Sequence, residues 1–344
     1  MDFRKRVYAF LLLSAILLAL CAFSPYGALD TKAFSERPSL LPGGTPFGIK
    51  FFTRGVIVVG VTDIETYGGI ASPAKDAGIR SGDIIVAVNG AEVNTTEELG
   101  EAVASCRGED TTFTVLRDGR TFNVTLRPLR SETDGVYRSG LWVRDSTAGI
   151  GTVTYVNADT GEFGGLGHGI CDAETGKPLP LLRGVVTDVT VTGVVKGRRS
   201  EPGELKGDFS CSLAGNIEKN TECGVFGTLN DVSAFGAEPM EICFPDEMKT
   251  GKAFILTTIE GDTPRLYEVC ILRIYENSGS TKNFLLEVTD KELLEKTGGI
   301  VQGMSGSPVI QDGRLCGAVT HVMINDPERG YGIFIENMLK AAQG

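Results

Sequence analysis

The stretch "GGIVQGMSGSPVIQDGRLCGAVTHV", from Gly298 to Val322, decides how the chain is interpreted. Glycines surround Ser305 and Ser307, and Pro308 begins a run of apolar, β-branched residues that is typical of a strand. Because glycine has no Cβ, the backbone at Gly303 can turn its N–H inward. The N–H groups of Gly303 and Ser305 would then point at one oxygen, as an oxyanion hole requires. The stretch allows two interpretations, a loose turn between strands or a loop that holds a nucleophile.

The composition excludes several classes of protein. The chain has 344 residues with 42% apolar residues, which is enough for two domains with sizeable cores. A net charge of −11 without a basic stripe makes nucleic-acid binding a poor fit. Eight cysteines without a C-x-x-C pair, and only two histidines, favour neither a disulfide scaffold nor a metal site. We therefore expect no metal and no cofactor, and the 45 glycines indicate many tight turns between strands.

The first 27 residues predict export of the chain. Arg4, Lys5 and Arg6 precede an apolar run from Val7 to Phe23, and basic residues on that side retain the N-terminus in the cytoplasm. We expect residues 1–27 to be a signal peptide or membrane anchor, and we favour an uncleaved anchor. Residues 28–45 lack periodicity and are predicted to be an exposed linker.

Residues 46–128 show the pattern of a small α+β domain. Strand 55–61 is followed by a short helix after Ser72, by a helix that Asn94 caps with Glu97, and by a hairpin at Asp118-Gly119. This order, with "SPAKDAGIRSGDIIVAVNG", resembles the PDZ domain of bacterial proteases. The resemblance implies that a peptide C-terminus adds as a strand beside an apolar-Gly-apolar loop. That loop would be Phe47, Gly48 and Ile49, although a PDZ domain used only for packing is the alternative.

Residues 129–344 predict a mainly β domain. Short apolar segments alternate with turn signals such as Asp159-Thr160-Gly161, which favours an antiparallel barrel or sandwich. Helical exceptions are expected in "KELLEKTGG" and at the C-terminus, in "ENMLKAAQG".

The loop "GMSGSP" resembles the G-x-S-G-G-P element of chymotrypsin-like serine proteases. That register makes Ser305 the nucleophile, places Gly303 and Ser305 in the oxyanion hole, and leaves Ser307 as a structural neighbour. A serine needs an imidazole to accept its proton, and we favour His168, which lies between Gly167 and Gly169. The strand after the nucleophile returns along the substrate cleft in such folds, so Thr320 and His321 are expected to line it.

The carboxylate that would orient the histidine is not decided by spacing. Every aspartate between the two catalytic candidates satisfies the order His, Asp, Ser, and most aspartates in loops are simply solvated. The candidates include Asp188, Asp208, Asp231, Asp246, Asp262 and Asp290.

Three longer segments carry a family resemblance: "GIGTVTYVNADTGEFGGLGHGICD", "VTDKELLEKTGGIVQGMSGSPVIQDG" and "GAVTHVMINDPERGYGIFIENML". Behind a PDZ domain and an anchor, they resemble the stage IV sporulation protein B peptidases of endospore-forming bacteria. The resemblance implies a chymotrypsin-like double β-barrel with the triad His168, Asp290 and Ser305. It also implies action in the forespore intermembrane space on a membrane-bound regulator of an intramembrane metalloprotease, which activates a sigma factor.

Two other functions stay open at this point. One is a non-catalytic adaptor, in which the PDZ domain binds a membrane partner and the barrel is inert. The other is cleavage of the chain's own linker between about Asp30 and Thr45, since an extended polar segment can enter a protease cleft.

Overall fold

The computed structural model describes residues 37–344, except 173–175, 234, 237 and 276–280. The predicted anchor at 1–27 and most of the predicted linker lie outside the described residues. In the described part of the chain, no helix has the length and apolar character that crossing a membrane requires.

Six strands close the first barrel. Antiparallel pairing runs from β2 to β11, β12, β15, β14, β13 and back to β2, so the ring has no open step. Its core holds fully buried aromatic rings such as Phe51 and Phe163. The strands are β2 (Pro46–Val61), β11 (Leu141–Val156), β12 (Glu162–Gly165), β13 (Leu181–Val195), β14 (Glu204–Thr221) and β15 (Gly224–Leu229).

A second closed barrel is formed by β17, β18, β19, β22, β21 and β20 in that order. Its interior is a separate cluster of buried residues that includes Phe284, Leu286 and Val319. The expected double β-barrel is therefore confirmed, as are the two expected helices, α4 (Lys291–Thr297) and α5 (Ile335–Gln343). The strands are β17 (Gly251–Thr257), β18 (Arg265–Ile274), β19 (Phe284–Val288), β20 (Pro308–Gln311), β21 (Arg314–Met323) and β22 (Asp326–Phe334).

The predicted PDZ domain has its own core, in which α3 (Thr96–Ser105) packs on a small sheet through Leu99 and Val103. The hairpin of β7 and β8 turns at Asp118-Gly119, as predicted, with both residues at positive φ. The other elements are β3 (Ile64–Thr66), β4 (Gly69–Ala71), α2 (Pro73–Asp76), β5 (Ile84–Val88), β6 (Ala91–Glu92), β7 (Thr111–Arg117), β8 (Arg120–Leu126), β9 (Leu129–Arg130) and β10 (Tyr137–Arg138).

The cap of α3 lies one residue later than predicted. Thr95, not Asn94, accepts the hydrogen bond from Glu98 N, and the Glu98 side chain accepts bonds in return, which completes a capping box. Asn94 Oδ1 instead accepts from Gly55 N. The asparagine therefore ties the start of the helix to β2.

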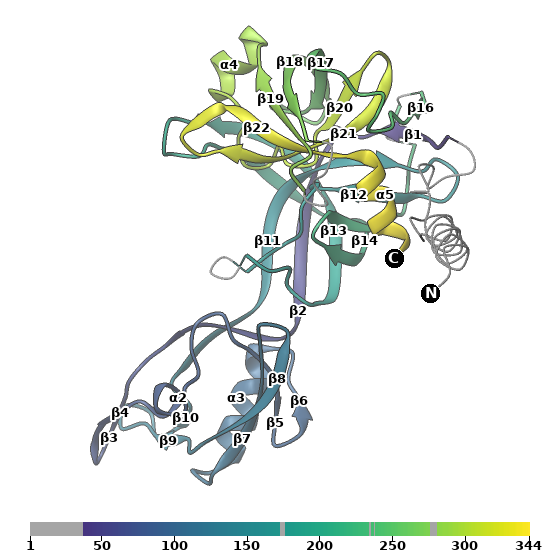
Figure 1. The fold of residues 1–344 in the computed structure, drawn as a ribbon. Coiled ribbons are helices and arrows are strands. Elements are labelled where there is room, and N and C mark those ends of the chain that lie inside the picture. Colours follow the sequence, from purple (N-terminus) through teal and green to yellow (C-terminus); the bar gives the residue numbers. More distant parts are fainter. Residues whose placement is uncertain (1–36, 173–175, 234, 237, 276–280) are drawn as a thin grey trace, which may run out of the picture. The chain divides into compact units, whose positions relative to one another are not determined.

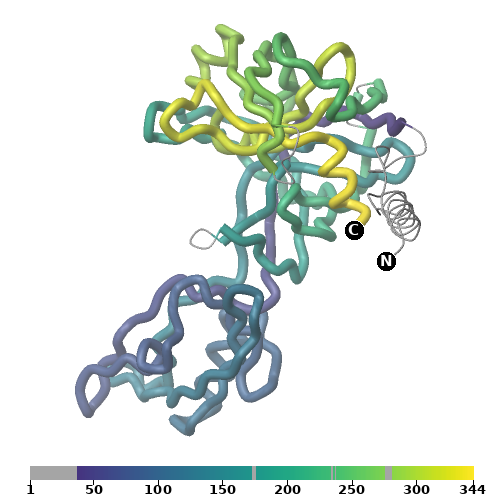
Figure 2. Tube along the Cα trace, viewed as in Figure 1, coloured from purple at the N-terminus to yellow at the C-terminus, as the bar shows by residue number. Residues whose placement is uncertain are grey.

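The long strands β2 and β11 belong to both the first barrel and the PDZ domain. They pair from Leu141 opposite Val61 to Thr152 opposite Pro46, and they run side by side in Figure 1 and Figure 2. The C-terminal half of β2 also pairs with β5 of the PDZ sheet. No loop separates the domains here, and the boundary falls within each strand.

The predicted carboxylate-binding loop is corrected by this arrangement. Phe47, Gly48 and Ile49 are consecutive residues of β2 that pair with β11 on one side and β13 on the other. Phe47 is buried and packs edge-to-face on Phe163 inside the barrel. Their amides are used by the sheet, so they hold no peptide carboxylate.

The end of the predicted linker is also a strand. Residues Ser39–Pro42 form β1, which pairs with β11 and with β16 (Met240–Glu241). Leu40 and Leu41 are buried. This part of the segment belongs to the fold and is not an exposed tether.

Candidate active site

The loop that carries Ser305 belongs to the second barrel but is held by a strand of the first. Thr152 N donates to Ser305 O at 2.9 Å, and Thr152 Oγ1 donates to Gly303 O at 2.7 Å. Thr154 Oγ1 donates to Gly306 O at 2.8 Å. Three carbonyls of the loop therefore face β11, which fixes the direction of the peptide planes.

The amides of this loop divide into bonded and open groups. Met304 N donates to Val301 O, and Gly306 N donates to Val319 O. Among the described residues, the N–H groups of Gly303 and Ser305 donate to no backbone carbonyl. Gly303 has φ +99°, a conformation that favours glycine. These two amides are therefore available to an oxyanion.

Gly306 permits the close approach of the loop to the first barrel. A Cβ at this position would overlap the carbonyl oxygen of Thr152 and the backbone of Leu166, and its φ is +96°. The glycine next to Ser305 is thus required for this close contact between the barrels.

The two serines have different surroundings. Ser305 Oγ is half-buried at the cavity and donates to Thr320 O at 2.8 Å. Ser307 Oγ is fully buried and donates to Thr257 Oγ1 at 2.9 Å inside the second barrel. Ser305 is therefore the serine that a substrate can reach.

His168 follows β12 in a segment that needs glycine on both sides. A Cβ at Gly167 would lie 2.9 Å from Thr320 Cγ2, and one at Gly169 would lie 2.5 Å from Thr221 O. The flanking glycines allow the backbone to pass between β21 and the end of β14.

One hydrogen bond orients the His168 ring. Its Nδ1 lies 2.9 Å from the carbonyl oxygen of Gly169, so a proton on Nδ1 donates to that carbonyl. We assign this tautomer from the hydrogen bond, and it leaves Nε2 as the acceptor. Burial lowers the pKa of His168, and the Gly169 bond opposes this effect. The ring is therefore neutral at neutral pH and able to accept a proton.

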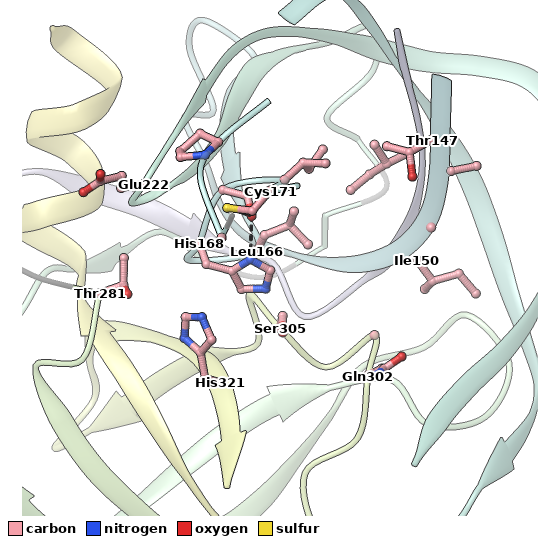
Figure 3. A pocket seen from close by; sticks show the side chains of 18 residues that line it. Thr147, Ile150, Leu166, His168, Cys171, Glu222, Thr281, Gln302, Ser305 and His321 are labelled. Carbon is pink, nitrogen blue, oxygen red and sulfur yellow. Dashed lines mark hydrogen bonds between the residues drawn. The ribbon is translucent and has the colours of Figure 1, made fainter. Parts of the chain in front are cut away.

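Ser305, His168 and His321 share a cavity of about 660 Å³. Figure 3 shows the His168 ring above Ser305, with the His321 ring beside them. Residues 147–150 of β11 form part of its wall. The other lining residues include Leu166, Cys171, Glu222, Thr281, Gln302 and Gly303.

The expected cleft residues both lie at this site. The His321 ring lines the cavity, and its centroid lies 5.0 Å from that of His168. Thr320 is buried and contributes its carbonyl, which accepts from Ser305. The direct contact between the histidines was not predicted, because nothing in the sequence spacing indicates it.

Asp290 does not join this group in the structure. It is the N-cap of α4, where Oδ1 accepts from Leu293 N at 3.0 Å, and its Oδ2 lies 3.4 Å from Glu268 N. Its carboxylate does not line the cavity, so the predicted contact with His168 is not formed. Asp188 and Asp262 line a different cavity. Glu222 is a carboxylate residue of the cavity that the sequence analysis missed.

Comparisons with known proteins agree with the two-part organisation. The family model for SpoIVB peptidase S55 matches residues 135–339, and a PDZ-domain model matches residues 66–117.

Two curated relatives match over short stretches. A putative zinc metalloprotease of Clostridium acetobutylicum is 29% identical over 119 residues, covering 33% of this chain and 35% of that protein. A putative zinc metalloprotease of Mesorhizobium japonicum is 42% identical over 57 residues, covering 17% and 16%. The chain thus spans about a third or less of the length of these relatives.

Two solved structures are similar at 13% identity. The HtrA-type protease AlgW with a decapeptide has a TM-score of 0.33, covering 58% of this chain and 53% of that one. An inactive mutant of Rv3671c from M. tuberculosis H37Rv has a TM-score of 0.31, covering 56% and 82%.

The close approach at Gly306 predicts a specific sensitivity. Gly306→Ala is expected to abolish peptide cleavage and lower the melting temperature, because the new methyl group pushes the loop away from Thr152. Gly313→Ala is the matched control, since Gly313 also has positive φ (+73°) but open space around it. The control should cost only about 1–2 kcal/mol and leave activity intact. Equal effects of both substitutions on melting and activity would contradict this account.

The position of Asp290 predicts a structural role. Asp290→Ala is expected to reduce the free energy of unfolding by about 1 kcal/mol through loss of the helix cap. It should change kcat/KM by less than about threefold, since no reacting atom loses a contact. Asp290→Asn retains a capping side chain and should resemble the wild type in both measurements. A folded Asp290→Asn protein with a severe loss of kcat would instead place this carboxylate in the triad.

Proposed function

We propose, since the chain belongs to the SpoIVB peptidase S55 family, that this serine peptidase cleaves a membrane-associated regulatory protein during sporulation signalling. The observation that carries the assignment of the site is the shared cavity. It brings together the Ser305 hydroxyl, the open amides of Gly303 and Ser305, and the His168 ring.

The proposed reaction begins with a change of partner for the Ser305 hydroxyl. In the resting site its proton points to Thr320 O, so rotation of the side chain must redirect it to Nε2 of His168. Such bonds often form only in the substrate complex. Ser305 Oγ then attacks the scissile carbonyl, and the Gly303 and Ser305 amides hold the oxyanion. His168 returns the proton to the leaving amine while the Gly169 carbonyl holds Nδ1–H.

We place the peptidase on the outer side of the membrane that its N-terminal segment enters. The support is the basic and apolar pattern of residues 1–23, together with the family. The proposed substrate is a membrane-bound regulator of an intramembrane metalloprotease, in the forespore intermembrane space. Self-cleavage would fall upstream of Ser39, because the residues from Ser39 to Pro42 are paired within the sheet.

The PDZ domain is proposed to hold an extended peptide of a protein partner. A cavity of about 640 Å³ is lined by Leu99 and Val103 of α3 and by Leu141, Trp142 and Val143 of β11. Along Leu141–Val143, β11 pairs with β2 on one edge, and no described strand pairs with its other edge. An unpaired strand edge facing a helix is what strand addition uses. Trp142 is 66% exposed and offers apolar surface to such a peptide.

Replacement of the nucleophile tests the proposed chemistry. Ser305→Ala is expected to abolish cleavage and labelling by a fluorophosphonate probe, because the attacking oxygen is removed. Ser307→Ala is the matched control: it should lose about 1 kcal/mol of stability with its bond to Thr257, and should still label. Labelling is followed by mass spectrometry of the modified peptide. Full cleavage by the Ser305→Ala protein would refute the site, and a wild-type protein that never labels would favour the adaptor function.

Replacement of groove residues tests the role of the PDZ domain. Trp142→Lys is expected to weaken cleavage of a full-length membrane substrate, since it removes exposed apolar surface from the groove and adds a charge that opposes an apolar peptide. A short peptide that spans only the cleavage site should be cut at the wild-type rate. Glu101→Lys on α3 is the control, because Glu101 is exposed and does not line the cavity. Equal loss on both substrates with Trp142→Lys would indicate a packing role.

A further inference from the structure

Two cysteines lie beside each other in the interior of the second barrel. Cys243 and Cys316 are the two buried cysteines among the seven that the structure describes, with exposed fractions of 5% and 1%. Both belong to the cluster of buried residues that fills this barrel. They are far apart in the sequence, so their pairing could not be predicted from cysteine spacing. The proposed peptidase reaction uses neither of them.

The backbone sets these two residues opposite each other. Ile242 and Leu315 form a parallel bridge, and Cys243 N donates to Leu315 O at 2.8 Å. Cys243 and Cys316 are the next residues of the two segments, so their Cα atoms are expected about 5 Å apart, with both side chains on one face. Disulfides join Cα atoms that are about 4.4–6.8 Å apart. The two thiols are therefore placed for a covalent bond.

The thiols also contact each other. A hydrogen bond with Cys243, followed by burial, raises the pKa of Cys316. A thiol with a raised pKa carries little thiolate, which is the nucleophile in disulfide exchange. Oxidation is therefore slow inside the folded barrel and has to begin before the barrel closes. A single buried cysteine usually acts as a small apolar side chain, whereas a contacting pair can be oxidised.

We propose that Cys243 and Cys316 form a disulfide as the exported chain folds, and that this bond fixes β21 to the segment that enters the second barrel. Exported compartments favour disulfides, so the inference rests on the location proposed above and not on the chemistry of Ser305.

The proposed reaction is an exchange with a disulfide-bearing protein or small molecule of that compartment. The thiolate of one cysteine attacks the disulfide of the oxidant and releases one of its two sulfurs as a thiol. The thiolate of the second cysteine then attacks the mixed disulfide and releases the other sulfur. Two electrons pass to the oxidant, and the two protons lost by the cysteines end on its two sulfurs.

The bond acts on the strand that holds the Ser305 loop. β21 binds this loop through the carbonyls of Val319 and Thr320, and Cys316 lies on the same strand. Cys243 follows β16, which pairs with β1. The bond closes a loop of about 70 residues and so lowers the entropy of the unfolded chain. Because neither cysteine lines the catalytic cavity, the expected effect is on stability and not on the chemical step.

Oxidative folding of the full-length protein tests the bond. The chain is refolded from denaturant in detergent, with either oxidised or reduced dithiothreitol, and free thiols are then blocked with N-ethylmaleimide. Mass spectrometry of an unreduced digest should show the peptides of Cys243 and Cys316 as one cross-linked species after oxidative folding. The oxidised protein should melt about 5–15 °C higher than the reduced protein. Its kcat/KM, measured well below melting, should differ by less than about twofold.

Matched variants separate the bond from simple packing of the thiols. The double variant Cys243→Ala/Cys316→Ala should melt at the same temperature in both conditions, because no bond can form. Cys270→Ala is the control, since Cys270 is only partly buried on β18, and it should retain the full difference between the two conditions. Each protein is compared with itself, so the loss of packing in a variant does not affect the result.

Several results would overturn the proposal. Residues 243 and 316 that both carry N-ethylmaleimide after oxidative folding, or cysteines linked only in other pairs, would reject the bond. A cross-link that leaves the melting temperature unchanged would reject its stabilising role. Free thiols at both positions in protein that is alkylated during cell lysis would refute oxidation on export. Labelling of Ser305 by a fluorophosphonate does not require the bond, so these failures would leave the proposed peptidase chemistry standing.

Discussion

The site depends on hydrogen bonds between a strand of one barrel and a loop of the other. Thr152 and Thr154 of β11 bind the carbonyls of Gly303, Ser305 and Gly306. Because each peptide unit is planar, these bonds fix the amides of the following residues, Met304, Gly306 and Ser307. The Gly303 N–H shares its peptide unit with Gln302 O, which accepts from Leu205 N of β14, and the Ser305 N–H shares its unit with Met304 O, which accepts from Ser307 N. The proposed oxyanion donor at Gly303 is therefore oriented by a strand of the first barrel, and the one at Ser305 by a bond within the loop. A threonine hydroxyl in a barrel core is satisfied by the same bonds that build the site.

His168 is positioned by a contact in the opposite direction, between its own segment and a strand of the second barrel. Gly167 lies against β21 of the second barrel, as the short distance to Thr320 requires, while the backbone at Gly169 passes close to Thr221. Each barrel thus contributes one of the two proposed catalytic side chains and also the surface that positions the other. Ser305 and His168 meet only when the barrels are docked. This arrangement explains why neither the loop nor the histidine segment is preorganised by local structure alone.

Ser305 and His168 could be selected from the local sequence around them. Contacts between segments that are far apart in the chain could not be predicted in this way. The glycines around Ser305 mark its loop in the sequence. Because the chain has only two histidines, few residues are candidates for the general base. The apolar-Gly-apolar run at Phe47–Ile49 is compatible with a carboxylate-binding loop and equally with a barrel strand. Only its pairing with β13 shows that it is a strand. The helix-capping role of Asp290 could have been predicted from the sequence, because an aspartate directly before "KELLEK" is a typical N-cap. Thr152 has no such signal, because its partners are 151 and 153 residues away.

The strand β11 links the two proposed binding regions physically. Its residues from Leu141 to Val143 line the PDZ groove, and those from Thr147 to Ile150 line the catalytic cavity. A peptide in the groove and a substrate in the cavity would contact the same strand. The ladder with β2 shifts register between Trp142 and Val143 and again between Arg144 and Ser146, which is where a sheet bends most easily. These irregular pairs lie between the two regions, whereas β11 keeps a regular register with β2 from Ser146 to Thr152.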